Sequence, residues 1–390
     1  MLKVLLTHPS STHGYYAELV ANPPAGVVFL ENHTLLTPHP HSRLREGASL
    51  LLRMFRLPHV RIIRQPIRSQ AKVIHSCQNL LLSRQPWVVD IEHACPFVGV
   101  HFSRLQSTLL KNIILALLAL PSCSAILPWT HTAVQGFLKT LSPNTSVRKK
   151  VRVVYPAVRV PDLSQRRTRP RECRLLFVAN PPLWNFFLKG GRELIAAYQV
   201  LKAKRQHLAL TIVGPVPPDI AAQCQHIPDI VLTGTITRTE LDRWYCASDI
   251  YVMPSFSDTF GMVFLEAMAF SLPVIALNRP YTQEIIQDDE TGLLVNFSAP
   301  SIRWVDPDGR FLLDSDAFIN RVTHAHADAE VVNGLVEKIG CLVDNPHLRV
   351  RLGINGREEI ISGRFSIPRR NTILREVYQE AAESSTRADH

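Results

Sequence analysis

Residues 249–277 read DIYVMPSFSDTFGMVFLEAMAFSLPVIAL and place a single acidic side chain inside an apolar run. Between residues 260 and 270, Glu266 is the only polar side chain. An apolar run of this kind is expected to be buried, and a buried carboxylate costs free energy unless donors pair with it. We therefore expect either a cationic side chain or a ligand hydroxyl to face Glu266.

The rest of the chain alternates short aliphatic runs with amphipathic segments. In the first half we expect strands at residues 3–7, 26–30, 72–76, 87–91, 124–127 and 152–155 and helices at 14–21, 103–119 and 132–141. In the second half we expect strands at residues 174–179, 208–213, 230–232, 250–253, 273–276 and 293–295 and helices at 191–204, 239–247, 261–270 and 333–343. Continuous apolar strands between helices predict an α/β fold with two Rossmann-like domains, each with a parallel sheet covered on both faces.

Residues 165–171, QRRTRPR, are charged and contain a proline, which is typical of an exposed linker. The sequence thus predicts an amino-terminal domain at 1–164, a carboxyl-terminal domain at 165–365 and a final helical segment at 366–390. Parallel sheets bind ligands beyond the carboxyl ends of their strands, so the chemistry is expected in a cleft between the two domains.

The composition limits the compartment and the partners. Lysine and arginine number 43 against 33 aspartates and glutamates, and the net charge of +10 suits a nucleotide, a phospholipid surface or a nucleic acid. The seven cysteines lie far apart without a Cys-x-x-Cys pair, which indicates reduced thiols and a cytoplasmic protein. The aliphatic run at residues 113–120 is far shorter than the roughly 20 residues that span a bilayer, so no membrane helix is expected.

Two glycine-containing segments are candidate phosphate sites. Neither half contains Gly-x-Gly-x-x-Gly after a strand, which disfavours a nicotinamide or flavin enzyme. Gly14 at a helix start is equally compatible with an ordinary turn. Lys189, Gly190 and Gly191 bring a cation and backbone amides to a helix amino terminus, where phosphate oxygens bind, although an isolated lysine here is also typical of a solvated surface.

The order of several motifs resembles family 4 retaining glycosyltransferases of the GT-B fold. The second half carries LLFVAN at 175–180, LKGG at 188–191, LTIVG at 210–214, the stretch from VLTGT at 231 to the end of the opening segment, and ETGLLV at 290–295. The first half is similar more loosely, through KVIHSC, PWVVDIEHACPF, SAILPWTHTAVQGFL and VRVVYPAV. The resemblance implies a GT-B architecture of two Rossmann-like domains.

In that family, two acidic residues separated by seven others bind a nucleotide-sugar donor, and they match Asp258 and Glu266. The resemblance implies that Glu266 holds the ribose hydroxyls, in preference to a salt bridge, and that Asp258 meets the transferred sugar. Asp258 is one methylene shorter than the family's usual glutamate, which leaves the choice of sugar open. The donor is also expected to contact the residues at the following helix start, Thr259, Phe260, Gly261 and Met262.

The resemblance assigns further donor contacts in the second half. Lys189 matches the lysine that binds the diphosphate. Asn180 stands where the family usually has an arginine, and Arg192 is a candidate to compensate for the missing charge. The loop ending at Ile236, Gly234-Thr235-Ile236, matches a loop that contacts the base and is compatible with uracil, guanine and adenine alike.

In the first half, His93 matches a histidine that approaches the donor sugar and the reacting centre. We expect Asp90 and Glu92 to hold its tautomer. His8, His13, His75 and His101 are weaker candidates for contacts with an acceptor.

The resemblance implies a hexosyltransferase that moves a sugar from a nucleotide-sugar donor to a glycan or lipid-linked acceptor, in cell-envelope polysaccharide or glycolipid synthesis. Lys189 and helix-end amides would stabilise the departing diphosphate, so neither a metal nor a cofactor is expected. A sugar-nucleotide epimerase of similar architecture and a catalytically degenerate GT-B binding module are the alternatives. Nucleic-acid binding is disfavoured because no stacking or groove-reading motif accompanies the arginines.

Two stretches lie outside the family pattern. Residues 41–72 contain seven arginines and one lysine against one glutamate, interleaved with apolar residues. They are equally compatible with binding to an anionic membrane surface, at the inner face of the membrane, and with a partly core-facing helix pair. Residues 296–329 form an insertion, expected to pack as a loop beside the donor cleft, whose His324, His326 and Asp328 make a poor metal site. By resemblance, the helix within 366–390 crosses back to the first domain.

Overall fold

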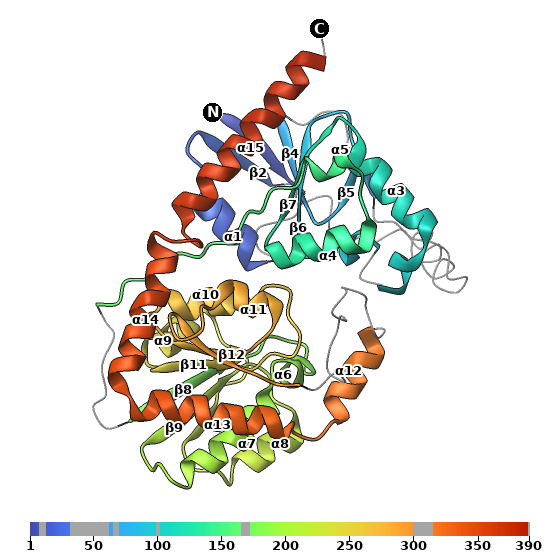
Figure 1. The fold of residues 1–390 in the computed structure, drawn as a ribbon. Coiled ribbons are helices and arrows are strands. Elements are labelled where there is room, and N and C mark those ends of the chain that lie inside the picture. Colours follow the sequence, from blue (N-terminus) through green and yellow to red (C-terminus); the bar gives the residue numbers. More distant parts are fainter. Residues whose placement is uncertain are drawn as a thin grey trace, which may run out of the picture. The chain divides into compact units, whose positions relative to one another are not determined.

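The computed structural model describes residues 1–7, 13–31, 62–64, 70–98, 102–164, 172–298 and 315–388. These residues form two compact units (Figure 1). The first contains the described residues up to Ala157 together with those from Ile367 onward, and the second contains those from Val158 to Ser366. The predicted linker at 165–171 lies outside the described residues.

The described part of the first unit is built on a five-stranded parallel sheet. Its strands, in the order in which they pair, are β2 (Val27–Glu31), β1 (Leu2–Leu6), β4 (Val73–Cys77), β6 (Trp87–Ile91) and β7 (Cys123–Pro128). Two further short strands, β3 (Ile62–Arg64) and β5 (Leu80–Leu82), pair with each other in parallel. The helices are α1 (Gly14–Ala21), α3 (Thr108–Ala119), α4 (His131–Leu141), α5 (Thr145–Arg148) and α15 (Ile367–Ala388), with 3-10 helices at Cys95–Val98 and Phe102–Gln106.

The described part of the second unit is built on a six-stranded parallel sheet. Its strands pair in the order β10 (Ile230–Leu232), β9 (Leu208–Val213), β8 (Cys173–Val178), β11 (Ile250–Met253), β12 (Val274–Leu277) and β13 (Gly292–Val295). Its helices are α6 (Asn185–Leu188), α7 (Gly191–Lys202), α8 (Pro218–Cys224), α9 (Arg238–Cys246), α10 (Met262–Ala269), α11 (Pro280–Ile285), α12 (Ser315–His324), α13 (Ala329–Asp344) and α14 (Pro346–Ile361).

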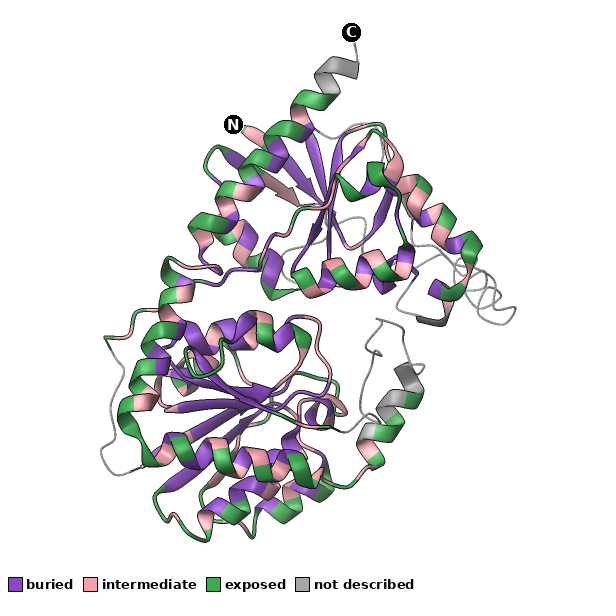
Figure 2. Cartoon of the chain, in the orientation of Figure 1, coloured by how far each residue is buried: buried purple, intermediate pink, exposed green. Residues whose placement is uncertain are grey.

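Strands β4 and β6 of the first sheet and β9 and β11 of the second are buried along their whole length, and Figure 2 shows buried strands in both sheets. Side chains of a strand point alternately to the two faces, so a strand with no exposed residue must be covered on both sides. The continuous apolar runs of the sequence therefore predict these two parallel sheets correctly, and the fold is an α/β arrangement of two Rossmann-like units.

The strand predicted at residues 152–155 is wrong. Only Val151 forms a bridge, with Ile126, and the amide of Arg152 donates to the Ile126 carbonyl at 2.9 Å. The chain from Arg152 to Pro161 then runs without regular structure. The amide of Val154 also donates to the Pro128 carbonyl of β7 at 3.0 Å, but residues 152–155 do not form a continuous ladder with β7.

Helix α15 packs on the sheet of the first unit through two buried polar side chains. The hydroxyl of Tyr378 lies 2.7 Å from Nδ1 of His75 on β4, and Arg370 donates to the carbonyl of Asn22 at 2.7 Å. Both side chains are almost fully buried. These contacts join the last described helix to β4 and to the carboxyl end of α1.

No helix within the described segments is both long and apolar enough to cross a membrane. Most of the basic segment at residues 41–72, for which a membrane surface and a partly core-facing helix pair were equal alternatives, lies outside the described residues.

Candidate active site

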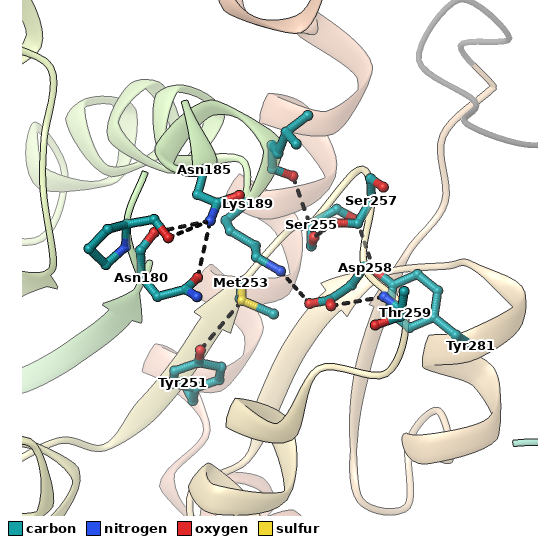
Figure 3. Close-up of polar contacts among 12 residues, drawn as sticks. Asn180, Asn185, Lys189, Tyr251, Met253, Ser255, Ser257, Asp258, Thr259 and Tyr281 are labelled. Atoms are coloured by element: carbon teal, nitrogen blue, oxygen red, sulfur yellow. Dashed lines mark hydrogen bonds and ion pairs between the residues drawn. The ribbon is translucent and has the colours of Figure 1, made fainter. Parts of the chain in front are cut away.

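The candidate site begins with an ion pair between Lys189 and Asp258 (Figure 3). Lys189 follows α6, and Asp258 lies in the loop between β11 and α10. Each side chain is 14% exposed, so the pair is largely but not fully withdrawn from water. The second carboxylate oxygen of Asp258 accepts a hydrogen bond from the amide of Thr259 at 2.9 Å. The structure thus brings the predicted diphosphate lysine and the predicted sugar-contacting aspartate together.

The glycine after Lys189 has a structural reason. Gly190 caps α7 with a φ of +77°, and a Cβ at this position would lie 2.4 Å from the carbonyl oxygen of Pro254. Only glycine combines this backbone conformation with so close an approach. The loop after β11 is also held by the amide of Phe256, which donates to the Leu188 carbonyl at 2.8 Å. This close packing fixes Lys189 beside the loop that carries Asp258.

Glu266 lies on α10 and is paired by the protein itself. Its Oε1 lies 2.5 Å from a guanidinium nitrogen of Arg238, and its Oε2 accepts a hydrogen bond from the hydroxyl of Tyr245 at 3.1 Å. Burial by itself would lower the pKa of Arg238. The nearby Glu266 carboxylate outweighs this effect and holds the pKa of Arg238 above its ordinary value. The expectation that a ligand would take the place of a salt bridge is therefore wrong as stated, because the side chain already has a cationic partner. Contact with a ribose remains a prediction.

The residues that precede Glu266 form the start of a helix, as expected, but the helix begins one residue later than the expected residue 261. The helix begins at Met262, and Gly261 is its amino-terminal cap with a φ of +84°. Phe260 is buried, and its ring lies 6.3 Å from that of Phe365. The backbone from Thr259 to Met262 therefore lies at the helix start, next to Asp258.

Asn180 lies just beyond the end of β8 and has its own structural partner. The side-chain amide of Asn185 donates to the carbonyl and the side-chain oxygen of Asn180, at 3.1 and 3.2 Å, and to the Pro181 carbonyl at 3.2 Å (Figure 3). The position at which relatives of the predicted family carry a charge is here part of a hydrogen-bonded turn before α6.

Arg192 does not replace that charge. Its guanidinium donates to the carbonyl of Thr323 at 2.7 Å and to that of Ala325, and it lies over the ring of Phe187 at 4.4 Å. The prediction that Arg192 compensates at the phosphate site is wrong, because these carbonyls at the end of α12 hold the guanidinium.

The predicted base-contacting loop lies at the carboxyl ends of β9 and β10. The amide of Gly214, at the end of β9, donates to the Gly234 carbonyl at 2.9 Å. Ile236 is half-buried, and Thr237 caps α9 through a reciprocal pair of hydrogen bonds with Glu240. The loop is thus fixed at both ends and leads directly into Arg238.

In the first unit, His93 follows β6 and accepts a hydrogen bond from the amide of Cys95 at 3.1 Å. Burial lowers the pKa of His93 to about 4, so the imidazole is neutral at pH 7. The expectation that Asp90 holds the tautomer of His93 is wrong. Asp90 accepts hydrogen bonds from Tyr16 at 2.8 Å and Trp129 at 3.1 Å instead. Glu92 accepts a hydrogen bond from Gln78 at 2.6 Å.

His75, predicted as an acceptor contact, is a core residue. It is fully buried, and its Nε2 lies 3.3 Å from the Asp90 carboxylate. His13 caps α1 by accepting from the amide of Tyr15 at 3.2 Å, and Gly14 is the first residue of this helix. His8 and His101 lie outside the described residues.

Residues 299–314 of the predicted insertion also lie outside the described residues, and helix α12 follows them. His324 ends α12 and Asp328 caps α13, so the alternating His-Ala-His-Ala-Asp segment is not a strand. Within the described ranges, no group of three or more histidine, cysteine, aspartate or glutamate side chains has the arrangement of a metal site.

Sequence patterns did not point to Glu193, on the first turn of α7, which is 3% exposed. Its Oε1 accepts a weak hydrogen bond from the amide of Asp328 at 3.4 Å, and its Oε2 has no hydrogen-bond partner among the described residues. Burial raises the pKa of Glu193 to about 7.

A raised pKa means that the folded protein keeps a proton that the unfolded chain releases between about pH 4.5 and 7. The contribution of Glu193 to stability is therefore largest below pH 4.5 and is lost as the pH rises through 7. Between pH 5 and 7.5, ionisation of Glu193 should lower the free energy of unfolding of the wild type by about 1 to 3 kcal/mol. We expect this decrease to be absent in Glu193→Gln. Urea unfolding at both pH values measures this, with Glu337→Gln at a mostly exposed site as the control. Equal pH dependence in the wild type and Glu193→Gln would contradict it.

Comparison with known proteins finds matches over part of the chain. Residues 172–302 match the family model described as glycosyl transferases group 1. D-inositol 3-phosphate glycosyltransferase of Paenarthrobacter aurescens is 34% identical over 165 residues, which cover 40% of this chain and 39% of that protein. The sulfoquinovosyl transferase SQD2 of Arabidopsis thaliana is 41% identical over 86 residues, 21% of this chain and 17% of that protein. The chain thus matches about two fifths or less of the length of these relatives.

Solved structures resemble the chain over nearly its whole length. Sucrose-phosphate synthase from Thermosynechococcus elongatus has a TM-score of 0.60 at 16% identity and covers 97% of this chain and 99% of its own. Anabaena HepE in complex with UDP has a TM-score of 0.59 at 15% identity, with coverages of 97% and 100%. At these identities the likeness is one of fold, and the fold is that of the GT-B class. The similarity to the glycosyl transferases group 1 family model extends over residues 172–302, about a third of the chain.

Proposed function

We propose that the protein is a retaining glycosyltransferase, which moves a sugar from a nucleoside diphosphate sugar to a glycan or lipid-linked acceptor in cell-envelope polysaccharide or glycolipid synthesis. The observation that carries the proposal is the pairing of Lys189 with Asp258 in the same matched segment that holds Glu266. A cation suited to a diphosphate lies beside a carboxylate suited to sugar hydroxyls, and both follow strands of one parallel sheet. Ligands of such sheets bind at the carboxyl ends of the strands.

The relatives support the donor and the acceptor classes. HepE was solved in complex with UDP, and another structure of the same protein contains UDP-glucose. The matched proteins include alpha-monoglucosyldiacylglycerol synthase of Streptococcus pneumoniae, 33% identical over 105 residues, whose product is a glycolipid by its name. A lipid-linked acceptor also suits the basic segment at residues 41–72, for which we propose contact with an anionic membrane surface.

In the proposed reaction, the bond between the anomeric carbon and the diphosphate oxygen breaks, and the acceptor oxygen bonds to the same face of the sugar. The acceptor proton passes to the departing phosphate oxygen. Negative charge develops on the diphosphate, where the Lys189 ammonium stabilises it electrostatically. The amides from residues 260 to 262 would add donors, so the charge is balanced by the protein's own groups without a metal.

The proposed roles of the remaining residues follow from their surroundings. When a diphosphate binds, the Lys189 ammonium contacts both the diphosphate and the Asp258 carboxylate. This carboxylate can then also accept hydrogen bonds from sugar hydroxyls. His93, neutral at pH 7, is proposed to contact the donor sugar as a hydrogen-bonding group without a charge. Backbone groups of the loop that ends at Ile236 are proposed to contact the base.

A binding module built on the same fold is the second candidate. It is favoured by Asn180, whose side chain belongs to a turn and supplies no cation, and by the engagement of Arg192 elsewhere. Product analysis separates the candidates: a transferase forms a glycoside only when an acceptor is present, an epimerase changes the sugar nucleotide without one, and a binding module leaves the donor intact.

Donor binding provides a direct test through Glu266. We expect Glu266→Ala to weaken binding of the preferred nucleoside diphosphate by about 10- to 100-fold, because hydrogen bonds to a charged group contribute roughly 1.5 to 3 kcal/mol. Isothermal titration calorimetry with UDP, GDP and ADP measures the effect. Glu337→Gln serves as the matched control, since the Glu337 side chain is 72% exposed and pairs with the neighbouring Lys338. Unchanged affinity of Glu266→Ala for the nucleoside diphosphate would contradict the proposal that Glu266 binds the ribose.

A further inference from the structure

Both oxygens of the Glu266 carboxylate are held by the protein. Arg238 contacts Oε1 and Tyr245 contacts Oε2, from two different turns of α9. An ionised carboxylate has about four acceptor positions, two on each oxygen. One position on each oxygen is therefore occupied, and the other is available for a ligand donor. Two neighbouring hydroxyls are the simplest ligand that matches this pair of acceptors.

The guanidinium of Arg238 is itself held in place. Its Nε donates to Oδ1 of Asp242 at 2.9 Å, one turn further along α9. The other oxygen of Asp242 pairs with Arg159, in the segment that begins the second unit. A planar guanidinium that donates from two of its nitrogens to two carboxylates has little freedom to rotate. The orientation of the Glu266 carboxylate is restricted in turn.

Arg238 also occupies a particular place along the chain. It is the first residue of α9, immediately after Thr237, which caps the helix, and close to the loop proposed to contact the base. Neither the motif spacing nor the resemblance singled out this arginine. Its contact with Glu266 and its position two residues after Ile236 bring it next to both the carboxylate proposed to bind the ribose and the loop proposed to bind the base.

We propose that Arg238 is a positioning residue for nucleoside recognition: it fixes the plane of the Glu266 carboxylate so that the two oxygens accept one hydrogen bond each from the 2′ and 3′ hydroxyls of a ribose. The inference rests on the proposed function. It makes Arg238 a determinant of the preference for ribonucleotides over 2′-deoxyribonucleotides. Without Arg238, only Tyr245 holds the carboxylate, which can then turn about its terminal bond and satisfy one hydroxyl as well as two.

The test compares the affinities of UDP and 2′-deoxy-UDP by calorimetry, or of the matching pair with guanine or adenine if that base binds more tightly. We expect the wild type to prefer the ribonucleotide by about 10-fold or more, since a hydrogen bond to a charged acceptor is lost in the deoxy compound. In Arg238→Gln this ratio should fall below about 3-fold, while Arg238→Lys should keep part of it. Arg243→Gln removes an equal charge from an exposed position of the same helix and should leave the ratio unchanged.

The outcomes separate the inference from the function on which it rests. A wild type that binds no nucleoside diphosphate overturns both. A wild type that prefers the ribonucleotide, with the same ratio in Arg238→Gln, overturns the inference and leaves the proposed function standing. A loss of affinity that is equal for both nucleotides in Arg238→Gln would show a merely structural role and also overturns the inference. Thermal unfolding of each variant verifies that it is folded before binding is measured.

Discussion

Lys189→Ala is expected to lower kcat for glycosyl transfer by about 100- to 1,000-fold, the usual cost of removing one group that stabilises developing negative charge. The lysine faces Asp258 in a site that is mostly shielded from water, where a cation acts more strongly than at the surface. The diphosphate gains charge as the sugar departs, so the loss should fall mainly on kcat, with a smaller rise in the KM of the donor.

The fold should survive this substitution. Asp258 keeps its hydrogen bond from the Thr259 amide and is exposed enough to be solvated after Lys189 is removed. Steady-state kinetics with the preferred nucleotide sugar and thermal unfolding measure the two effects separately. Lys189→Arg tests the charge, and Lys204→Ala, at an exposed site near the end of α7, is the matched control. Turnover of Lys189→Ala within 3-fold of the wild type would exclude Lys189 from the chemistry.

The parallel sheets could be predicted from local sequence because burial on both faces leaves a local record. Strands such as β9 and β11 consist almost entirely of apolar residues, and each is followed by a helix with its own pattern. Residues 152–155 fail this rule because two valines satisfy a strand pattern, while the backbone makes only isolated hydrogen bonds to β7 and no continuous ladder. Whether a strand forms depends on what lies beside it, and the local sequence does not contain that information.

The candidate site was predictable where a motif spans few residues and unpredictable where partners come from afar. The spacing between Asp258 and Glu266 is local, whereas the arginine that pairs with Glu266 lies 28 residues earlier. Asp90 was assigned to the nearby His93, but its partners are separated from it by much longer stretches of chain, as in its hydrogen bond with Tyr16. Charge pairing is decided by packing, so the nearest residue in sequence is a poor guide to the partner.

Asp90→Ala should destabilise the first unit by about 3 to 5 kcal/mol, the range found when one member of a buried polar pair is removed. Asp90 is fully buried on β6, where one carboxylate oxygen serves Tyr16 and Trp129 and the other faces His75. Alanine withdraws the acceptor that these side chains share, and their polar groups stay buried in the core.

The effect should reach α15, because the hydroxyl of Tyr378 binds the same His75. Tyr378→Phe removes one hydrogen bond and should cost only about 1 kcal/mol, and Asp90→Asn, which keeps an acceptor oxygen, should lie between the two. Since the chain has two units, a global unfolding curve would mix their transitions. Hydrogen–deuterium exchange of the backbone amides of β4 and β6 during urea unfolding, resolved by peptide mass spectrometry, follows the first unit separately. A decrease of less than 1 kcal/mol in the free energy of unfolding for Asp90→Ala would mean that water or another acceptor replaces the carboxylate. It would also mean that the contacts of Asp90 and His75 do not hold α15 in place.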